Sequence, residues 1–430
     1  MLIEFSVENF RSFRDKTTFS MIASRLREPQ LDRDNVIVVD DKLSLLRSAA
    51  VFGANASGKS NLLTAIGAMR YFVLATSKDK IASEDRVEDP FAFQTNTADS
   101  PSSFEAVFLI EGVQYRYGFS VSSKNITAEW LYCTPTRREA TLFTRENDEI
   151  TVGASFREGR WIRDQKLDIT DKLFLSVVAL FKKEGVAWKV WHWFANSIAL
   201  ITGVKDINYM NYTMKRLEDP QYREQITELV SRLDLDISSL SVRQIPIDDK
   251  IYHELRSHHR IRNGQGEIVS ESDFPARETE SDGTWKLIGL AGPLLDVLST
   301  GKTLLADELD SSLHPILMSA IVKLFNSPKT NPNGAQLICS IHNTDLLDHS
   351  LLRRDQIYFV EKDEFSVSRL YSLADFKLEE GGRRVVRSDA SFAKNYIQGR
   401  YGAIPYLGDI QTLFQVGELV EDSERRKVTA

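Results

Sequence analysis

A glycine-rich loop near the start of the chain constrains the possible fold more than any other feature. Residues 53–60 read GANASGKS and match the phosphate-loop pattern G-x-x-x-x-G-K-[ST] without a mismatch. The apolar segment Ser48 to Phe52 precedes the loop, and apolar residues at helical spacing follow it from Ser60 to Val73. A strand, a glycine loop and a helix in this order predict a P-loop fold, because the loop N–H groups and the positive end of the helix together bind a phosphate group.

The residue types in this loop predict a site for ATP and Mg²⁺. Glycines let the backbone turn its N–H groups towards the β-phosphate. We expect Lys59 to reach the β- and γ-phosphates, as a catalytic and a binding residue, and the Ser60 hydroxyl to ligate Mg²⁺. The predicted nucleotide-binding residues of the loop and its helix are Gly53, Asn55, Ser57, Gly58, Lys59, Ser60 and Asn61.

A pair of carboxylates after a second apolar segment supplies the next part of the predicted site. The segment Thr303 to Ala306 predicts a short buried strand that ends at Asp307 and Glu308. We expect Asp307 to hold Mg²⁺ and Glu308 to polarise the attacking water as a catalytic residue. Strands that end in Asp-Glu are also common where they meet solvent, so this interpretation depends on the phosphate loop in the same chain.

Three further short motifs follow the order found in ABC-type heads. Residues 310–315 (DSSLHP) stand at the position of a D-loop, and His342, after an apolar segment, resembles a catalytic switch histidine. Upstream, Ser281 and Gly283 lie where an ABC signature would bind a γ-phosphate at a helix N-terminus, although Asp282 replaces the first of the two usual glycines. Each motif alone has an ordinary alternative, namely a turn that caps a helix or a histidine hydrogen-bonded at a strand end. Their order along the chain favours the functional interpretation.

The alternation of strands and helices predicts an α/β fold: an ABC-type (SMC-like) P-loop ATPase head with a mixed sheet and an inserted helical lobe. We expect an N-terminal ATPase lobe over residues 1–165, a helical insertion over 166–265 and a C-terminal ATPase lobe over 266–430. The predicted strands are Ile3–Phe10, Ser48–Phe52, Phe104–Leu109, Gln114–Val121, Thr303–Leu305, Gln336–Ser340 and Gln356–Val360, with strand-like pieces at Phe156 and Trp161. Helical patterns cover Leu167–Ser239, Ser281–Leu298 and Pro315–Phe325, and His253–Arg262 predicts an exposed hairpin.

Composition is typical of an ordinary globular protein. Hydrophobic residues make up 42% of the 430 residues and charged residues 27%, which allows a sizeable core. The formal net charge of −7 predicts no global attraction to nucleic acid, so such binding would need a local basic patch. Cys133 and Cys339 are far apart, no leader-like segment opens the chain, and no apolar run is long enough to span a bilayer. These features predict a cytoplasmic location without membrane contact.

The motifs together resemble those of bacterial ATP-binding proteins grouped with the abortive-infection L ATPase and the overcoming-lysogenization-defect (OLD) ATPases, which are AAA-type phage-defence relatives of SMC heads. The resemblance rests on residues 8–13 (ENFRSF), 52–61, 280–284, 307–315, 340–343 and 394–405. It implies a homodimer, or a higher oligomer, that closes head-to-tail around two ATP molecules, with Ser281 and Gly283 of one protomer completing the site of the other. It also implies that the segment from Asn9 to Phe13 lies near the adenine or the phosphates, with Asn9 and Arg11 as the candidate nucleotide-binding residues and Arg11 the foremost of them. Gln94 is the candidate Q-loop residue that senses the metal, although a glutamine before a polar loop has an ordinary interpretation that is as common.

The chain also departs from these relatives. It has no long heptad arm and no acidic cluster after Pro405 arranged like a nuclease site. The resemblance therefore implies the sensor ATPase of an anti-phage defence system that acts with a separate nuclease-type effector. Two other interpretations stay open: a DNA-maintenance ATPase of SMC type, which would contact nucleic acid, and an ATP-dependent dimeric scaffold that hydrolyses slowly.

Overall fold

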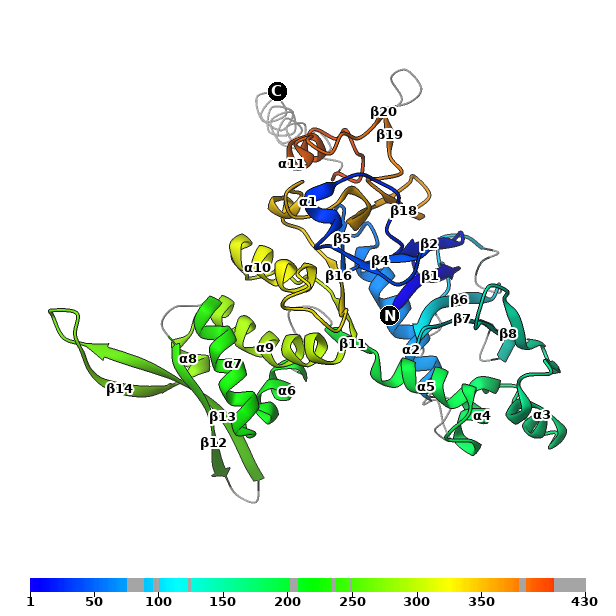
Figure 1. The fold of residues 1–430 in the computed structure, drawn as a ribbon, viewed down its shortest axis with the longest axis horizontal. Coiled ribbons are helices and arrows are strands. Elements are labelled where there is room, and N and C mark those ends of the chain that lie inside the picture. Colours follow the sequence, from blue (N-terminus) through cyan, green and yellow to red (C-terminus); the bar gives the residue numbers. More distant parts are fainter. Residues whose placement is uncertain are drawn as a thin grey trace, which may run out of the picture.

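The computed structural model describes residues 1–75, 89–95, 97, 100–122, 125–201, 208–233, 237–247, 250–378 and 384–405. Its centre is a six-stranded sheet in which five strands are parallel and the last is antiparallel (Figure 1). The strand order is β11 (Ile198–Ile201), β15 (Thr303–Ala306), β16 (Gln336–Ser340), β5 (Ser48–Phe52), β17 (Ile357–Lys362) and β18 (Ser368–Ser372). The mixed α/β fold predicted from the sequence is therefore confirmed.

The central strands are apolar throughout because the sheet is covered on both faces. Every residue of β5, β15 and β16 is buried. Alternate residues of β5 belong to opposite cores: Ala49 and Val51 pack in the core that contains helix α2 (Lys59–Ala75), whereas Ala50 and Phe52 pack in the core of the helices on the other face. Those helices are α9 (Asp282–Thr300) and α10 (Pro315–Asn326), which confirms the two helices predicted there.

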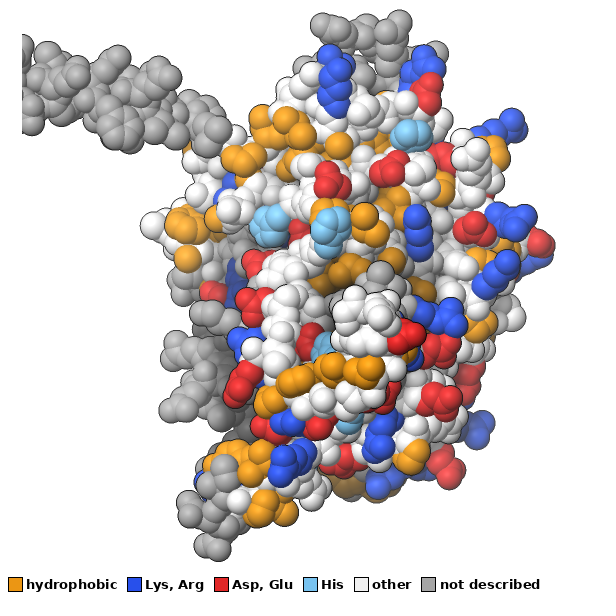
Figure 2. All heavy atoms as spheres, turned by 90° about the vertical axis from the view of Figure 1, so that its left-hand side faces the viewer, with side chains coloured by type: hydrophobic (Ala, Val, Ile, Leu, Met, Phe, Trp, Pro, Cys, Tyr) orange, Lys and Arg blue, Asp and Glu red, His pale blue; other side chains and the backbone are white. Residues whose placement is uncertain are grey.

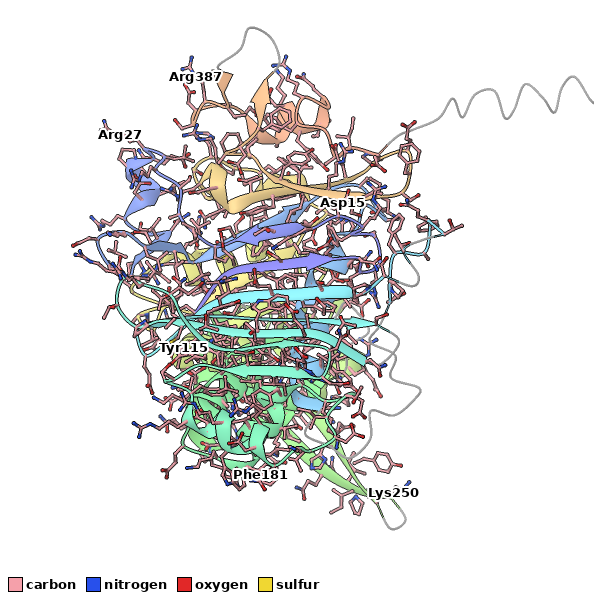
Figure 3. The ribbon with its side chains drawn as sticks, turned by 90° about the vertical axis from the view of Figure 1, so that its right-hand side faces the viewer. Asp15, Arg27, Tyr115, Phe181, Lys250 and Arg387 are labelled. Atoms are coloured by element: carbon pink, nitrogen blue, oxygen red, sulfur yellow. The ribbon has the colours of Figure 1, made fainter. Side chains whose placement is uncertain are left out.

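A seven-stranded antiparallel sheet packs beside α2 and contains the N-terminal strand; it fills the middle of the view in Figure 3. Its strand order is β10 (Glu149–Val152), β9 (Ala140–Glu146), β8 (Asn125–Thr134), β7 (Val113–Ser122), β6 (Ser102–Ile110), β1 (Leu2–Glu8) and β2 (Thr17–Ser20). The strand pair predicted around Glu111 and Gly112 is confirmed as β6 and β7. Helices α4 (Phe174–Phe181) and α5 (Val186–Asn196) complete this core, where Trp193 stacks on Phe108 with ring centroids 4.0 Å apart.

The sequence prediction was wrong for two segments before residue 240. Phe156 and Trp161 do not lie in strands, because helix α3 (Arg157–Asp164) buries Gly159 and Ile162 at helical spacing against Phe156. The segment Leu167–Ser239, predicted to be helical, holds α4, α5, α6 (Asn208–Arg216) and α7 (Pro220–Leu233), but β11 within it is a strand of the central sheet. A run of four residues such as IALI has no helical or strand period of its own, and pairing with β15 decides its conformation.

The predicted hairpin His253–Arg262 lies within the middle strand of a separate antiparallel sheet that projects from the molecule (Figure 1). This sheet consists of β12 (Ile237–Ile247), β13 (Lys250–Arg262) and β14 (Ile268–Pro275). Helix α8 (Ala276–Thr279) follows it and leads into α9. Because both β12 and β13 fall within residues 166–265, this part of the chain is not purely helical. The three-part division of the chain itself stays a prediction.

The remaining elements are short. They are α1 (Pro29–Asp32), β3 (Val36–Val38), β4 (Ser44–Leu46), the 3₁₀ turns Thr344–Leu346 and Arg354–Gln356, β19 (Lys377–Leu378), β20 (Arg384–Val385) and α11 (Phe392–Ile397). Among the described residues, no helix has the length and apolar character that crossing a membrane requires.

Candidate nucleotide site

The phosphate loop connects β5 to α2 in a backbone conformation that requires its glycines. Gly53 has φ +152° and Gly58 has φ +115°, values that residues with a side chain rarely adopt. A Cβ atom at Gly53 would lie 2.3 Å from the carbonyl oxygen of Val360, and one at Gly58 would lie 2.3 Å from Ser368 Oγ. Both positions therefore exclude other residues through backbone conformation and through close packing.

Lys59 lies across this loop at the start of α2. Its ammonium group donates hydrogen bonds to the carbonyl oxygens of Gly53, at 2.8 Å, and Ala54, at 3.0 Å. Burial lowers the pKa of Lys59, while the nearby carboxylates of Asp307, Asp310 and Glu308 act in the opposite direction. The ammonium is thus held between the loop and a group of negative charges, as a phosphate-binding lysine requires.

The acidic pair meets the phosphate loop because β15 and β5 flank the same strand, β16. Asp307 Oδ1 accepts hydrogen bonds from Ser60 Oγ at 3.1 Å and from Ser340 Oγ at 2.5 Å. Ser340 Oγ in turn accepts a hydrogen bond from the backbone N–H of Glu308 at 2.8 Å. A hydroxyl and a carboxylate oxygen side by side are the kind of ligand that Mg²⁺ prefers, so these residues fit the predicted cation.

A cavity of about 760 Å³ lies over the phosphate loop, and it is lined by residues 55–61, Glu308, His342 and Lys362. His342 Nε2 lies 3.9 Å from Glu308 Oε1. The backbone around His342 is fixed by Asp310 Oδ2, which accepts hydrogen bonds from the N–H groups of His342, at 2.8 Å, and Asn343, at 2.6 Å. The D-loop aspartate therefore positions the histidine segment relative to the acidic pair.

Ser281 and Gly283 lie at a second, open cavity, which Ser312 and His314 also line. Ser281 is the N-cap of α9, and its hydroxyl accepts a hydrogen bond from the Thr284 N–H at 3.1 Å. A Cβ at Gly283 would lie 2.7 Å from the carbonyl oxygen of Ser312, so glycine lets this helix start approach the D-loop closely. Neither Ser281 nor Gly283 lines the phosphate-loop cavity of the same chain.

Residues 48–348 match the model of a protein family described as "AAA domain, putative AbiEii toxin, Type IV TA system". This match covers more than half of the chain and includes the loop, the acidic pair and the histidine segment. The chain belongs to this AAA-domain family of P-loop ATPases.

Two solved structures resemble the AAA-domain protein at low identity. An SMC head domain from Thermotoga maritima is 16% identical, with 86% of this chain and 98% of that chain covered and a TM-score of 0.39. An SMC head bound to the C-terminal winged-helix domain of ScpA is 14% identical, with 88% and 98% covered and a TM-score of 0.43. A comparison with curated protein sequences gives no match.

Three residues predicted at the nucleotide do not line the phosphate-loop cavity of the AAA-domain protein. The Asn9 amide is buried and donates hydrogen bonds to the carbonyl oxygens of Thr97 at 2.9 Å and Ser100 at 2.8 Å. Arg11 pairs with Asp89 at 3.1 Å, and the side chain of Gln94 accepts a hydrogen bond from Arg14 at 3.4 Å. None of the three lines the described cavity, so the structure gives Asn9 a structural role, and nucleotide contact by these residues stays a prediction.

Ser12 lies within the segment that the resemblance places near the nucleotide, but it was not singled out as a site residue, although it touches the loop. Ser12 Oγ accepts a hydrogen bond from Asn61 Nδ2 at 2.7 Å, and it would lie 2.7 Å from a Cβ at Gly58. Its carbonyl oxygen accepts a hydrogen bond from the Ser368 N–H at 2.7 Å. Lys286, Ser340 and Lys362 were also not predicted as site residues. Ser340 lies in the histidine motif at residues 340–343, whereas Lys286 and Lys362 lie outside the motifs that carry the resemblance.

Proposed function

We propose that this AAA-domain protein binds ATP with Mg²⁺ at the phosphate loop and hydrolyses it in a homodimer. The observation that carries the proposal is the meeting of Lys59, Ser60 and Glu308 at one cavity, with Asp307 hydrogen-bonded to Ser60. A glycine loop, a buried lysine, a hydroxyl–carboxylate pair and a second carboxylate are the groups that phosphoryl transfer to water needs.

Each side chain has a role that its surroundings support. The Lys59 ammonium binds oxygens of the β- and γ-phosphates, and Ser60 and Asp307 are the residues that would hold the cation. Mg²⁺, when bound there, neutralises charge on the phosphates. Glu308 orients a water molecule for in-line attack on the γ-phosphorus, and the nearby His342 helps to fix the Glu308 carboxylate and the γ-phosphate.

The separation of the two cavities supports a head-to-tail dimer. In one chain, Ser281 and Gly283 line a cavity that shares no residue with the phosphate-loop cavity. The Ser281 hydroxyl and the start of α9, with its positive helix end, form a surface suited to the γ-phosphate of ATP bound to a second copy. ATP would therefore hold the two protomers together, as the family resemblance implies.

Glu308→Gln and Lys59→Ala test the nucleotide chemistry. Glu308→Gln keeps the shape of the site but cannot act as a base, so we expect it to bind ATP, to accumulate as a dimer and to hydrolyse at least about 100-fold more slowly. Lys59→Ala is expected to lose ATP binding or the productive position of the phosphates. Light scattering with and without Mg-ATP measures the dimer, and phosphate release measures turnover. A Glu308→Gln protein that hydrolyses ATP at the wild-type rate would show that another group activates the water.

For the biological role, we infer that the protein is the sensor ATPase of a bacterial anti-phage defence system that acts with a separate nuclease-type effector. Two features support this inference: the family description names a toxin of a type IV toxin–antitoxin system, and the motifs resemble those of the abortive-infection L and OLD group. ATP-driven closure of the dimer would change the surface offered to the effector, which is a population shift caused by preferential ATP binding to the closed form.

Purification of tagged Glu308→Gln with Mg-ATP, co-expressed with its native neighbouring genes, tests this role. A stoichiometric nuclease-like protein in the complex, together with phage protection that the Lys59→Ala variant lacks, is the expected result. DNA alone in the complex would replace this role by DNA maintenance. That alternative has no support on the face shown in Figure 2, where acidic and basic side chains are mixed. A bare dimer without phage protection would instead favour a scaffold.

A further inference from the structure

Strand β17 runs parallel to β5 and ends at the same edge of the sheet as the phosphate loop. The two strands are paired up to Phe359 and Phe52, the last residue before the loop. One residue further, the carbonyl oxygen of Val360 lies against Gly53, where it would be 2.3 Å from a Cβ atom. Lys362, the last residue of β17, therefore reaches beyond the sheet beside the phosphate loop, and its side chain lines the nucleotide cavity.

The neighbouring residue Glu361 is fixed on the opposite side of the strand. Glu361 Oε2 accepts a hydrogen bond at 3.1 Å from the N–H of Ala403, in the segment that follows α11, and one at 3.3 Å from the hydroxyl of Tyr371 in β18. Successive side chains of a strand point to opposite faces. The contact of Glu361 with the C-terminal segment thus explains why Lys362 faces the phosphate loop.

The pairing of β17 with β18 fixes the position of Lys362 relative to the phosphate loop. Lys362 is directly opposite Ser368 in the β17–β18 pair. Ser368 is buried, its hydroxyl donates a hydrogen bond to the Ser57 carbonyl oxygen at 2.5 Å, and its N–H donates to the Ser12 carbonyl oxygen at 2.7 Å. Because residues directly opposite each other in an antiparallel pair have Cβ atoms about 5 Å apart, Lys362 is held within side-chain reach of the phosphate loop.

The ammonium of Lys362 has no carboxylate partner within the part of the chain that the structure describes. The adjacent Asp363 is already engaged: one oxygen accepts hydrogen bonds from the N–H groups of Phe365 and Val367, and the other lies 3.4 Å from Arg369. A lysine without an ion pair at the rim of an anion-binding cavity attracts negatively charged ligands.

We propose that Lys362 is a second nucleotide-binding cation, which contacts the phosphate chain of ATP from the β17–β18 hairpin. The inference rests on the proposed function of the phosphate loop. Lys59 reaches the phosphates from the helix that follows the loop, and Lys362 reaches them from the strand beside it. Each lysine neutralises part of the negative charge of the polyphosphate. Because Lys362 belongs to the β17–β18 hairpin, the affinity for nucleotide depends on where this hairpin lies relative to the phosphate loop.

Matched variants at this one position test the proposal. Lys362→Met keeps the aliphatic stem and removes the charge, and Lys362→Arg keeps the charge. Lys42→Met is the control, because Lys42 is an exposed lysine in the turn between β3 and β4 that does not line the cavity. Dissociation constants for ATP, ADP and AMP are measured by calorimetry on the full chain, at low and at high salt.

We expect Lys362→Met to weaken ATP binding by about 5- to 30-fold at low salt, since a charge-assisted contact at a partly exposed site is lost. The loss should be smaller for AMP than for ATP and should shrink at high salt because counterions screen the exposed charge. Lys362→Arg and Lys42→Met should stay within about twofold of the wild type.

Two results overturn the assignment of Lys362. One is an ATP affinity of Lys362→Met equal to that of the wild type; the other is an equal loss for AMP and ATP that does not depend on salt, which would indicate packing of the stem. A wild-type protein that binds no ATP would overturn the proposed function itself, and this outcome differs from both because it does not involve the variants.

Discussion

Lys286 joins the signature helix to the acidic pair, and its removal is expected to slow hydrolysis without preventing ATP binding. It lies on α9, five residues after Ser281, and its side chain is only 5% exposed. Its ammonium donates hydrogen bonds to the carbonyl oxygen of Glu308 at 3.0 Å and to Ser311, at 2.8 Å for the carbonyl oxygen and 2.6 Å for Oγ. Movement of the start of α9 is thus transmitted to the backbone of the proposed catalytic glutamate.

The stability effect of Lys286→Met follows from two opposing contributions. Burial lowers the pKa of Lys286 from 10.5 to about 8, so the folded protein disfavours the ammonium by about 3 kcal/mol. Three hydrogen bonds to a charged donor offset this with roughly 1.5–3 kcal/mol each at most. Methionine of similar length removes both contributions and leaves three oxygens without this donor, so we expect a destabilisation of about 1–6 kcal/mol at pH 7.

The pH dependence of this difference has a defined sign. Between about pH 8 and 10.5 the unfolded chain binds a proton at Lys286 that the folded chain has released. The stability of the wild type relative to Lys286→Met should therefore rise as the pH rises through this window. Thermal unfolding at several pH values measures the effect.

Turnover is expected to fall while ATP binding is kept. Because the backbone of Glu308 and the D-loop lose an anchor, we expect kcat to fall about 10- to 100-fold, the range that a displacement near 1 Å causes. ATP affinity should be unchanged, since Lys286 does not line the cavity. The matched control is Lys302→Met, which removes a lysine that pairs with Asp296 at 2.8 Å, at the other end of the same helix. Wild-type turnover in a folded Lys286→Met protein would refute the proposed coupling.

Three further perturbations test other parts of the fold and the site. Gly283→Ala places a Cβ 2.7 Å from the Ser312 carbonyl oxygen, so ATP-dependent dimerisation and turnover should fall while monomeric ATP binding persists; an unchanged dimer would show that the D-loop can move aside. Burial raises the pKa of Glu129 to about 7, so between about pH 4.5 and 7 the folded chain holds a proton at Glu129 that the unfolded chain has released. As the pH rises through this window, the wild type should lose on the order of 2–3 kcal/mol of stability relative to Glu129→Gln. Parallel melting curves of the two proteins across that range would contradict this. Asn9→Ala removes the amide that holds Thr97 and Phe91, so we expect a stability loss of about 2–4 kcal/mol with ATP affinity unchanged; weaker ATP binding at equal stability would restore Asn9 to the nucleotide site.

The parts of the site that sequence predicts are those whose chemistry depends on adjacent residues. Gly53 and Gly58 are recognisable because the loop needs positive φ angles there, and Lys59 and Ser60 follow at fixed spacing at the start of α2. The acidic pair is recognisable because a fully buried strand must end before two charged residues. In these segments the residue types that the local backbone and burial require are also the residue types that the nucleotide site requires.

The parts that sequence did not predict depend on contacts between distant segments. The strand β11 has a sequence, IALI, that fits a strand or a buried helix equally well, and only pairing with β15 determines which forms. Lys286, Ser340 and Lys362 each act through a partner more than 20 positions away along the chain or through a cavity, and no short-range pattern marks them. A lysine in a helix is usually a solvated residue, and only burial against the D-loop identifies Lys286 as different.

In the segment after β1, the family resemblance singles out Asn9 and Arg11, whereas Ser12 is the residue that the structure shows in contact with the phosphate-loop segment. Asn9 and Arg11 both have positive φ angles, and Phe10 and Phe13 bond to each other across a tight turn with Arg11 and Ser12 at its tip. This turn directs the Arg11 side chain to Asp89 and the Ser12 hydroxyl to Asn61 beside the phosphate loop. Ser12 also binds the β17–β18 hairpin through Ser368, whose hydroxyl bonds to the loop. The segment therefore connects the antiparallel sheet, the phosphate loop and the β17–β18 hairpin that carries Lys362 through direct hydrogen bonds.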